Sequence, residues 1–261
     1  MSVMSWLRLY HPVKRPRVRL VCFPHAGAGA AVYRPWVAEL PPDIELLAVC
    51  YPGRQDRFGE PFAPSVGAMA ADVASALASV AGSAEEPPLA LFGHSMGALV
   101  AYEVALRLEH QHRLAPRYLF VSGRWVPDRA DGRQLHLASD AELLDEMRRL
   151  GSVDLKLLEI PEIRELALPV LRADYRLLSL HRRAYLDRVN APIASYVGDR
   201  DAGCSVEDAG QWARATSGEF ALKTFPGDHF YLVEHRKALI GDLCDRLAGA
   251  HVPAGTVQAL P

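Results

Sequence analysis

A serine flanked by glycines is the strongest chemical signal in the sequence. The segment Gly93-His94-Ser95-Met96-Gly97 has the pattern G-x-S-x-G, and it lies between an apolar, strand-like run and a segment with helical spacing. In that context the small glycines permit a strained turn that raises the serine hydroxyl above a sheet. The pattern alone occurs by chance in many chains, but the flanking elements favour a nucleophilic serine over a merely glycine-rich turn.

The base expected beside this serine is a histidine from near the end of the chain. A serine hydroxyl is a weak nucleophile, so it needs a histidine to accept its proton and an acid to orient that histidine, in the chain order serine, acid, histidine. His229 lies in the Pro/Gly-broken loop within Phe225–Tyr231, from which a side chain can point into a site. His235 begins the last helical pattern, and His251 lies in the tail. We therefore expect His229 to be the base rather than an ordinary solvated loop histidine.

Two candidates for the acid follow the apolar run Ile193–Val197. Asp199 and Asp201 both come just after it. A carboxylate beyond the carboxyl end of a parallel strand lies on the same rim of the sheet as Ser95. Either residue could instead be a turn or helix-capping aspartate. The spacing does not separate the two.

A loop of small residues is expected to stabilise an oxyanion. The run Val18–Phe23 leads into Pro24–Gly29, where small side chains allow close approach of the backbone. The backbone N–H groups of Ala26 and of Met96, the residue after the nucleophile, are the expected donors. The loop resembles a phosphate cradle only superficially, because it is not G-x-G-x-x-G and no acidic ribose partner ends a second strand. We therefore expect no nucleotide cofactor.

Along the chain that carries these residues, strand-like apolar runs alternate with segments whose apolar residues have helical spacing. Short, nearly continuous apolar runs rich in β-branched and aromatic residues are typical of buried parallel strands, and segments with helical spacing lie between them. This alternation predicts an α/β fold with a mostly parallel sheet covered by helices on both faces. The expected strands are Val18–Phe23, Ile44–Tyr51, Leu89–Phe92, Tyr118–Ser122, Ile193–Val197 and Phe220–Phe225, and the expected helices include Ser65–Val80, Met96–Leu108 and Arg236–Leu247.

Residues 126–190 break the alternation with helical patterns only. Ser139 and Glu142 have capping-box spacing, and a second apolar pattern runs from Leu166 to Leu178. The region is far longer than a crossover needs, so we expect an inserted helical lid, although the helices could simply cover the sheet. The expected organisation is a core of residues 1–125 and 191–248, the lid region 126–190, and a loose C-terminal tail, 249–261.

Composition excludes several function classes. The chain has 261 residues, half of them apolar, and a net charge of −2 from 29 basic and 31 acidic side chains. A chain so close to neutral has no overall positive electrostatic field that would attract nucleic acid or an acidic membrane. The apolar stretches are far shorter than the roughly 20 residues that cross a bilayer. The N-terminal residues lack the apolar core of a signal peptide, which favours the cytoplasm. The 4 cysteines form no C-x-x-C pair, so we expect buried structural thiols and no metal site.

Seven short segments, taken together and in their order along the chain, are characteristic of one protein family. They are Cys22–Gly27, Tyr51–Arg57, Gly93–Gly97, Val121–Arg124, Leu168–Asp174, Gly198–Asp201 and Gly227–Phe230. Together they resemble the type II thioesterases of polyketide and non-ribosomal peptide synthesis, and also the related medium-chain fatty acid synthase thioesterase. The resemblance implies an α/β-hydrolase fold with a mobile lid. It also implies a catalytic triad of Ser95, Asp201 and His229, which selects Asp201 over Asp199.

The resemblance also implies a substrate and partners. It implies a free-standing enzyme, a monomer without cofactors, that removes aberrant or stalled acyl groups from the phosphopantetheine arms of acyl or peptidyl carrier proteins. A medium-chain thioesterase, a general carboxylesterase and a non-catalytic binding protein of the same fold are the alternatives. Carrier domains are acidic, so four arginines at the edge of the lid could steer docking, or they could form an ordinary solvated face. These arginines are Arg172, Arg176, Arg182 and Arg183.

Overall fold

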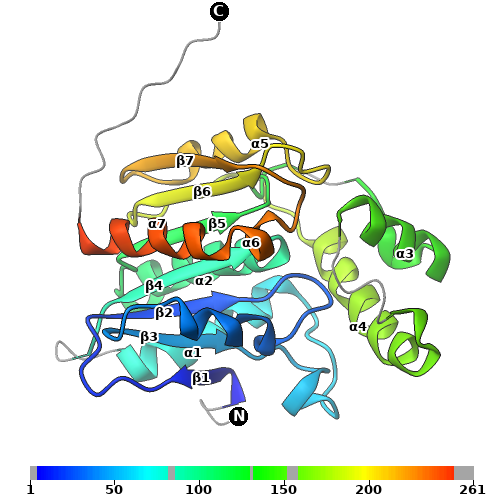
Figure 1. Cartoon of the computed structure of the whole chain (residues 1–261), viewed down its shortest axis with the longest axis horizontal. Coiled ribbons are helices and arrows are strands. Elements are labelled where there is room, and N and C mark those ends of the chain that lie inside the picture. The colour runs from blue at the N-terminus through cyan, green and yellow to red at the C-terminus, as the bar shows by residue number, and fades with distance from the viewer. Residues whose placement is uncertain (1–4, 82–85, 130–131, 152–157, 250–261) are drawn as a thin grey trace, which may run out of the picture.

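A single twisted sheet forms the centre of the molecule (Figure 1). The structure is a computed structural model that describes residues 5–81, 86–129, 132–151 and 158–249. The sheet has seven strands in the order β1-β3-β2-β4-β5-β6-β7. β1 runs antiparallel to β3, and all other neighbours pair in parallel. The strands are β1 (Leu7–His11), β2 (Val18–Phe23), β3 (Ile44–Val49), β4 (Leu89–His94), β5 (Tyr118–Ser122), β6 (Ile193–Gly198) and β7 (Phe220–Phe225).

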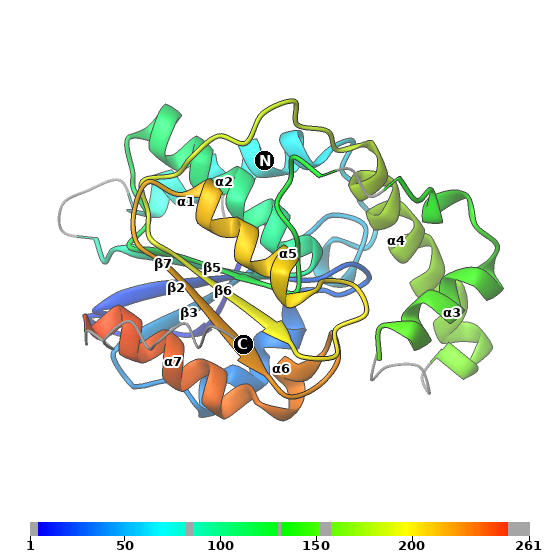
Figure 2. The same cartoon turned by 90° about the horizontal axis from the view of Figure 1, so that it is seen from above.

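Helices cover both faces of the sheet, which confirms the predicted α/β class (Figure 2). One face packs against α1 (Val66–Ala81), α2 (Met96–His112) and the short α5 (Val206–Gly210). The other face packs against the 3₁₀ helix η2 (Ala30–Ala38), α6 (Tyr231–Glu234) and α7 (Arg236–Ala248). Successive residues of a strand enter different cores, as the pleat requires. In the central strand β4, Leu91 joins the core under α1 and α2, whereas Ala90 and Phe92 join the core under α7.

In the part of the lid region that the structure describes, two α-helices lie beyond the carboxyl ends of the strands (Figure 2). Helix α3 (Asp140–Arg149) begins at the predicted capping box, in which the Ser139 side chain accepts from the Glu142 amide and the Glu142 carboxylate accepts from the Ser139 amide. Helix α4 (Pro161–Leu180) contains the second predicted apolar pattern. The 3₁₀ helices are η3 (Gln55–Arg57), η4 (Leu135–Leu137) and η6 (Gln211–Ala215). The division into a core and a lid subdomain stays a prediction.

Several smaller expectations can be compared with the described residues. Cys22, Cys50 and Cys204 are buried, Cys244 is half-buried, and all four thiols are free. Within the described ranges, no three or more His, Cys, Asp or Glu side chains are grouped to hold a metal ion, and none of the helices found there has the length and apolar character needed to cross a bilayer. The predicted loose tail, 249–261, lies outside the described residues except for Gly249, which ends α7.

Candidate active site

Ser95 occupies a strained turn between β4 and α2. Its backbone has φ 55° and ψ −117°, a conformation that costs on the order of 1–3 kcal/mol in a non-glycine residue. A Cβ atom at Gly93 would lie 2.1 Å from the carbonyl oxygen of Gly97, and one at Gly97 would lie 1.9 Å from that of Phe23. The Ser95 amide donates to the Ser122 carbonyl at 2.8 Å, which ties the turn to the neighbouring strand. The motif therefore requires both glycines for steric reasons.

His229 is held by Asp201. The Nδ1 atom of His229 lies 2.8 Å and 3.0 Å from the two carboxylate oxygens of Asp201. Both side chains are almost completely buried. Oδ1 of Asp201 also accepts from the amides of Gly203 and Cys204, at 2.7 Å and 3.1 Å. A carboxylate at Nδ1 fixes the tautomer in which Nδ1 carries the hydrogen and Nε2 can accept a proton.

The other acid and base candidates lie elsewhere. Asp199 accepts from the Gly227 amide at 2.8 Å, and its side chain is half-exposed. It therefore braces the loop that carries His229 without touching the imidazole. His235 precedes α7 and packs its ring against Phe225, whereas His251 lies outside the described residues.

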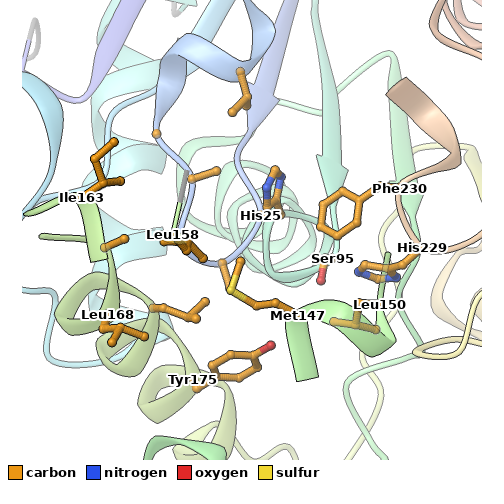
Figure 3. A pocket seen from close by; sticks show the side chains of 17 residues that line it. His25, Ser95, Met147, Leu150, Leu158, Ile163, Leu168, Tyr175, His229 and Phe230 are labelled. Carbon is orange, nitrogen blue, oxygen red and sulfur yellow. The ribbon is translucent and has the colours of Figure 1, made fainter. Parts of the chain in front are cut away.

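Ser95 and His229 line a common cavity of about 300 Å³ (Figure 3). Most of the lining is apolar, and it comes from the loop after β2 and from the lid region. Met147, Leu168 and Leu171 from the lid region contribute to it, whereas Leu143 of α3 is buried but does not line it. The remaining large lining side chains are His25, Val32, Leu150, Leu158, Ile163, Tyr175 and Phe230.

The expected oxyanion donors adjoin this cavity. Ala26 lines it, and Met96 is the first residue of α2, directly after Ser95. The next amide in the loop, that of Gly27, donates to Oδ2 of Asp174 in α4 at 2.8 Å. Arg54 donates to the Ala28 carbonyl at 3.1 Å. The loop is therefore held by two buried side chains from different parts of the chain.

Sequence reasoning did not find the pairing of Arg54 with Asp174. The guanidinium and carboxylate form two bonds of 2.6 Å and 2.7 Å, and their side chains are 8% and 1% exposed. Both residues belong to segments that carry the family resemblance, Tyr51–Arg57 and Leu168–Asp174. They lie 120 positions apart. No local spacing rule links such distant positions.

Neutral histidines surround His229. The ring centroid of His94 lies 4.7 Å from that of His229 and 5.8 Å from that of His25. Nδ1 of His94 lies 2.9 Å from the Ser122 hydroxyl, which is itself 2.7 Å from the hydroxyl of Tyr231. Burial lowers the pKa of His25 to about 3 and holds the pKa of His94 well below its ordinary value, with His229 nearby as a second cause for each. Near neutral pH, both rings are therefore uncharged neighbours of the base.

The four lid arginines have different surroundings. Arg172 donates to the carbonyls of His136 and Ala138 and pairs with Asp140. Arg183 pairs with the buried Glu103, so it too is a structural residue. The side chains of Arg176 and Arg182 are exposed. A docking surface made of all four arginines is therefore not supported.

Comparisons with known proteins agree with this geometry. Residues 18–247 match the family model described as Thioesterase domain. The chain is 40% identical over 242 residues to Thioesterase PikA5 of Streptomyces venezuelae, covering 93% of this chain and 85% of that protein. It is 38% identical to the type II thioesterase BorB of the borrelidin biosynthetic cluster, with a TM-score of 0.83 and coverage of 93% and 98%. It is 29% identical to YbtT, a type II thioesterase from the yersiniabactin NRPS/PKS pathway, with a TM-score of 0.83 and coverage of 94% and 99%.

The match extends over almost all of the sheet and its helices, including the turn that carries Ser95 and the loop that carries His229. The fold, the turn and the relatives thus point to one conclusion: this chain belongs to the thioesterase domain family and is a hydrolase that acts on thioesters.

Proposed function

We propose that this protein is a type II editing thioesterase, which hydrolyses aberrant or stalled acyl groups from the phosphopantetheine thioester of acyl or peptidyl carrier proteins. One observation carries the proposal. Ser95, on its strained turn, and His229, held by Asp201, face a single apolar cavity beside a loop of backbone amides. That is the arrangement that acyl transfer through a serine ester needs.

In the first half of the reaction, Ser95 Oγ attacks the thioester carbonyl carbon and its proton passes to Nε2 of His229. Asp201 stabilises the imidazolium that forms. The amides of Ala26 and Met96 donate to the oxyanion of the tetrahedral intermediate. When the C–S bond breaks, His229 returns the proton to the sulfur, and the pantetheine thiol leaves.

In the second half, water replaces the thiol. His229 removes a proton from the water as its oxygen attacks the ester carbonyl, and it then returns that proton to Ser95 Oγ as the ester bond breaks. A carboxylic acid is released and the enzyme is restored. Side chains, backbone amides and water account for every proton and electron pair, so the proposal includes neither a metal nor an organic cofactor.

The editing role and the partners have separate support. BorB and YbtT are described as type II thioesterases, from the borrelidin biosynthetic cluster and from an NRPS/PKS pathway, and in such pathways acyl intermediates are held on carrier proteins. We propose that the enzyme acts as a cytoplasmic monomer on those carriers, with the lid region over the acyl chamber. The apolar lining from α3 and α4 supports that role for the lid.

The proposal is tested by comparing two substrates. Purified protein should hydrolyse an acetyl group from a carrier protein with a higher kcat/KM than it hydrolyses p-nitrophenyl acetate, an aryl ester that lacks the pantetheine arm. A general carboxylesterase would show the opposite order, and a binding protein of this fold would hydrolyse neither. A medium-chain releasing enzyme would prefer carriers loaded with eight or more carbons.

A further inference from the structure

The carboxyl-terminal end of helix α3 contacts the loop that carries Asp201. Nη1 of Arg149, the last residue of α3, donates to the carbonyl oxygen of Ala202 at 2.7 Å. Ala202 directly follows Asp201 in the chain, and the same loop holds the Asp201 carboxylate through two of its amides. A side chain of the lid region is therefore bonded to the short loop that presents the acid to the base.

The guanidinium of Arg149 is oriented by its own helix. Nε and Nη2 each lie 2.7 Å from a carboxylate oxygen of Glu146, one turn earlier on α3. Glu146 is buried, and its hydrogen bonds hold the pKa of Arg149 above the ordinary value. Nη1 makes the bond to the Ala202 carbonyl, and a hydrogen bond from a charged donor is stronger than one between neutral groups. Helix α3 therefore presents a charged, oriented donor to the loop.

Leu150, the next residue, packs beside the bond between Asp201 and His229. A Cβ atom at Gly203 would lie 2.9 Å from Cδ2 of Leu150. The same point is 3.2 Å from Oδ1 of Asp201 and 3.4 Å from Nδ1 of His229. Leu150 also lines the acyl chamber and a narrower cavity of about 30 Å³ that reaches Ser95 and His229 (Figure 3). An apolar side chain at this place lowers the local dielectric, which strengthens the bond between the carboxylate and the imidazole.

Gly151 makes a third contact, with the loop that carries His229. Its backbone has φ 77°, and a Cβ atom there would lie 2.0 Å from Oδ2 of Asp228. Asp228 directly precedes His229, and its Oδ1 accepts from the Phe230 amide at 2.8 Å. Position 151 therefore requires glycine for two reasons, because the conformation is left-handed and because the chain comes so close to the Asp228 carboxylate.

We propose that residues 149–151, at the end of α3, position Asp201 and His229 for catalysis. Arg149 is a positioning residue, which acts through the Ala202 carbonyl on the loop that presents the Asp201 carboxylate. Leu150 shields the bond between acid and base, and Gly151 lets the chain close against the loop of His229. The inference rests on the proposed function, in which these two residues are the acid and the base, and it adds that the lid region takes part in orienting them.

The first test removes the bond between Arg149 and Ala202. Arg149→Met keeps most of the length of the side chain and loses the donor, so kcat should fall by roughly tenfold while KM changes much less, because the base is misplaced. The loss should be equal on acetyl-carrier protein and on p-nitrophenyl acetate, since both acyl groups need the same base. Arg148→Met is the matched control, because Arg148 is exposed and pairs with Asp145 on the same helix. An unchanged kcat in Arg149→Met, or an equal loss in Arg148→Met, would overturn the proposal.

The second test uses two glycines of the lid region. Gly132 has φ 69°, close to that of Gly151, but no described atom lies within 4 Å of the position that its Cβ would take. Alanine is strained by the backbone at both positions, and only at position 151 does the added methyl group meet the Asp228 carboxylate. We therefore expect Gly151→Ala to lower kcat and Gly132→Ala to leave it close to the wild-type value. Equal kcat values in the two variants would contradict the contact with the loop of His229.

The third test observes the acid and base without turnover. A proton shared between a carboxylate and a histidine Nδ1 gives a far-downfield resonance in the proton NMR spectrum. This resonance should broaden or move upfield in Arg149→Met and stay unchanged in Arg148→Met. If the wild-type protein hydrolyses no carrier-bound thioester, the proposed function fails, and the resonance still tests the inference. If the wild type is active and Arg149→Met keeps both its kcat and its resonance, the inference fails alone.

Discussion

The carboxylate of Asp174 in helix α4 joins the lid region to the loop that carries Ala26. It accepts two bonds from Arg54 and one from the Gly27 amide, and Arg54 in turn holds the Ala28 carbonyl. The position of the Ala26 amide is therefore coupled to the position of α4. If α4 moved away, the loop would lose the group that orients it, so we expect an oxyanion to be stabilised best when α4 is in place.

Asp174→Asn tests this coupling. The amide of asparagine cannot balance the charge of the buried Arg54, so the loop that carries the Ala26 amide should lose its orientation. We therefore expect kcat to fall by roughly 10²-fold, because a well-oriented oxyanion donor is lost. KM should change much less. The matched control is Asp140→Asn, which breaks the exposed ion pair between Asp140 and Arg172, a contact within the lid region that does not reach the loop. Steady-state kinetics and thermal unfolding of both variants separate catalysis from stability. Equal losses of kcat in the two variants would contradict the coupling.

Ser95→Ala tests the covalent mechanism. Alanine fits the turn sterically but supplies no nucleophile, so turnover should fall by roughly a millionfold, as it does in serine proteases. The unfolding midpoint should stay close to that of the wild type. Turnover near the wild-type rate on acetyl-carrier protein would rule out an acyl-enzyme at this position.

Asp201→Asn and Asp199→Asn form a matched pair that tests the identity of the acid. An amide at position 201 would favour the wrong tautomer of His229, so kcat should fall by roughly 10⁴-fold. The Asp199 side chain accepts from the loop amide of Gly227 and pairs with Arg200, away from the imidazole, and its substitution should have a small effect. The pH–rate profile of both variants provides a second readout. If the two variants exchange behaviour, the acid is Asp199.

The pattern of the chain predicted the inner sheet well because burial on both faces leaves a continuous apolar signal. Strands β2, β5 and β7 have the predicted bounds, and the other predicted strands differ by one or two residues at one end. Strand β1 was missed. It lies at the edge of the sheet, where Arg8 and Leu9 are exposed, so its sequence has no buried run. Contacts such as that between Arg54 and Asp174 could not be predicted from the sequence, because they depend on how distant segments fold together.

The stability of the fold should decrease as the pH falls, in part because of His25. Its pKa falls from an ordinary 6.5 to about 3 in the folded state, chiefly through burial and secondarily through His229 and Arg54. Between these values the unfolded chain binds a proton that the folded chain does not. The stabilisation is therefore complete above about pH 6.5 and is lost as the pH falls toward 3. His94 acts in the same direction.

Chemical unfolding between about pH 7 and pH 4 measures this effect. His25→Gln removes one of the two histidines whose pKa is lowered in the folded state, so the free energy of unfolding should depend less steeply on pH than in the wild type. His110→Gln, at an exposed position on α2, serves as the control. A slope as steep in His25→Gln as in the wild type would contradict the assignment.

The acyl chamber should favour short substrates. Each buried CH₂ group contributes about 0.8 kcal/mol, close to fourfold in binding, so a deep apolar tunnel would make kcat/KM rise steadily with chain length. An editing enzyme must spare long correct intermediates, which argues against such a tunnel. A cavity of about 300 Å³ is at the lower end of the range for ligand pockets.

We therefore expect kcat/KM on carrier protein to be highest with acetyl or another short group and to fall across butyryl, hexanoyl and decanoyl. Met147 and Ser95 line the same chamber (Figure 3), and Met147→Ala should move the preference toward longer chains by adding volume. Leu144→Ala on the same helix, outside the chamber lining, should leave the profile unchanged. A continuous rise through decanoyl in the wild type would show that the lid encloses a long tunnel. The enzyme would then be a medium-chain thioesterase, because its binding energy would select the chains that an editing enzyme has to leave in place.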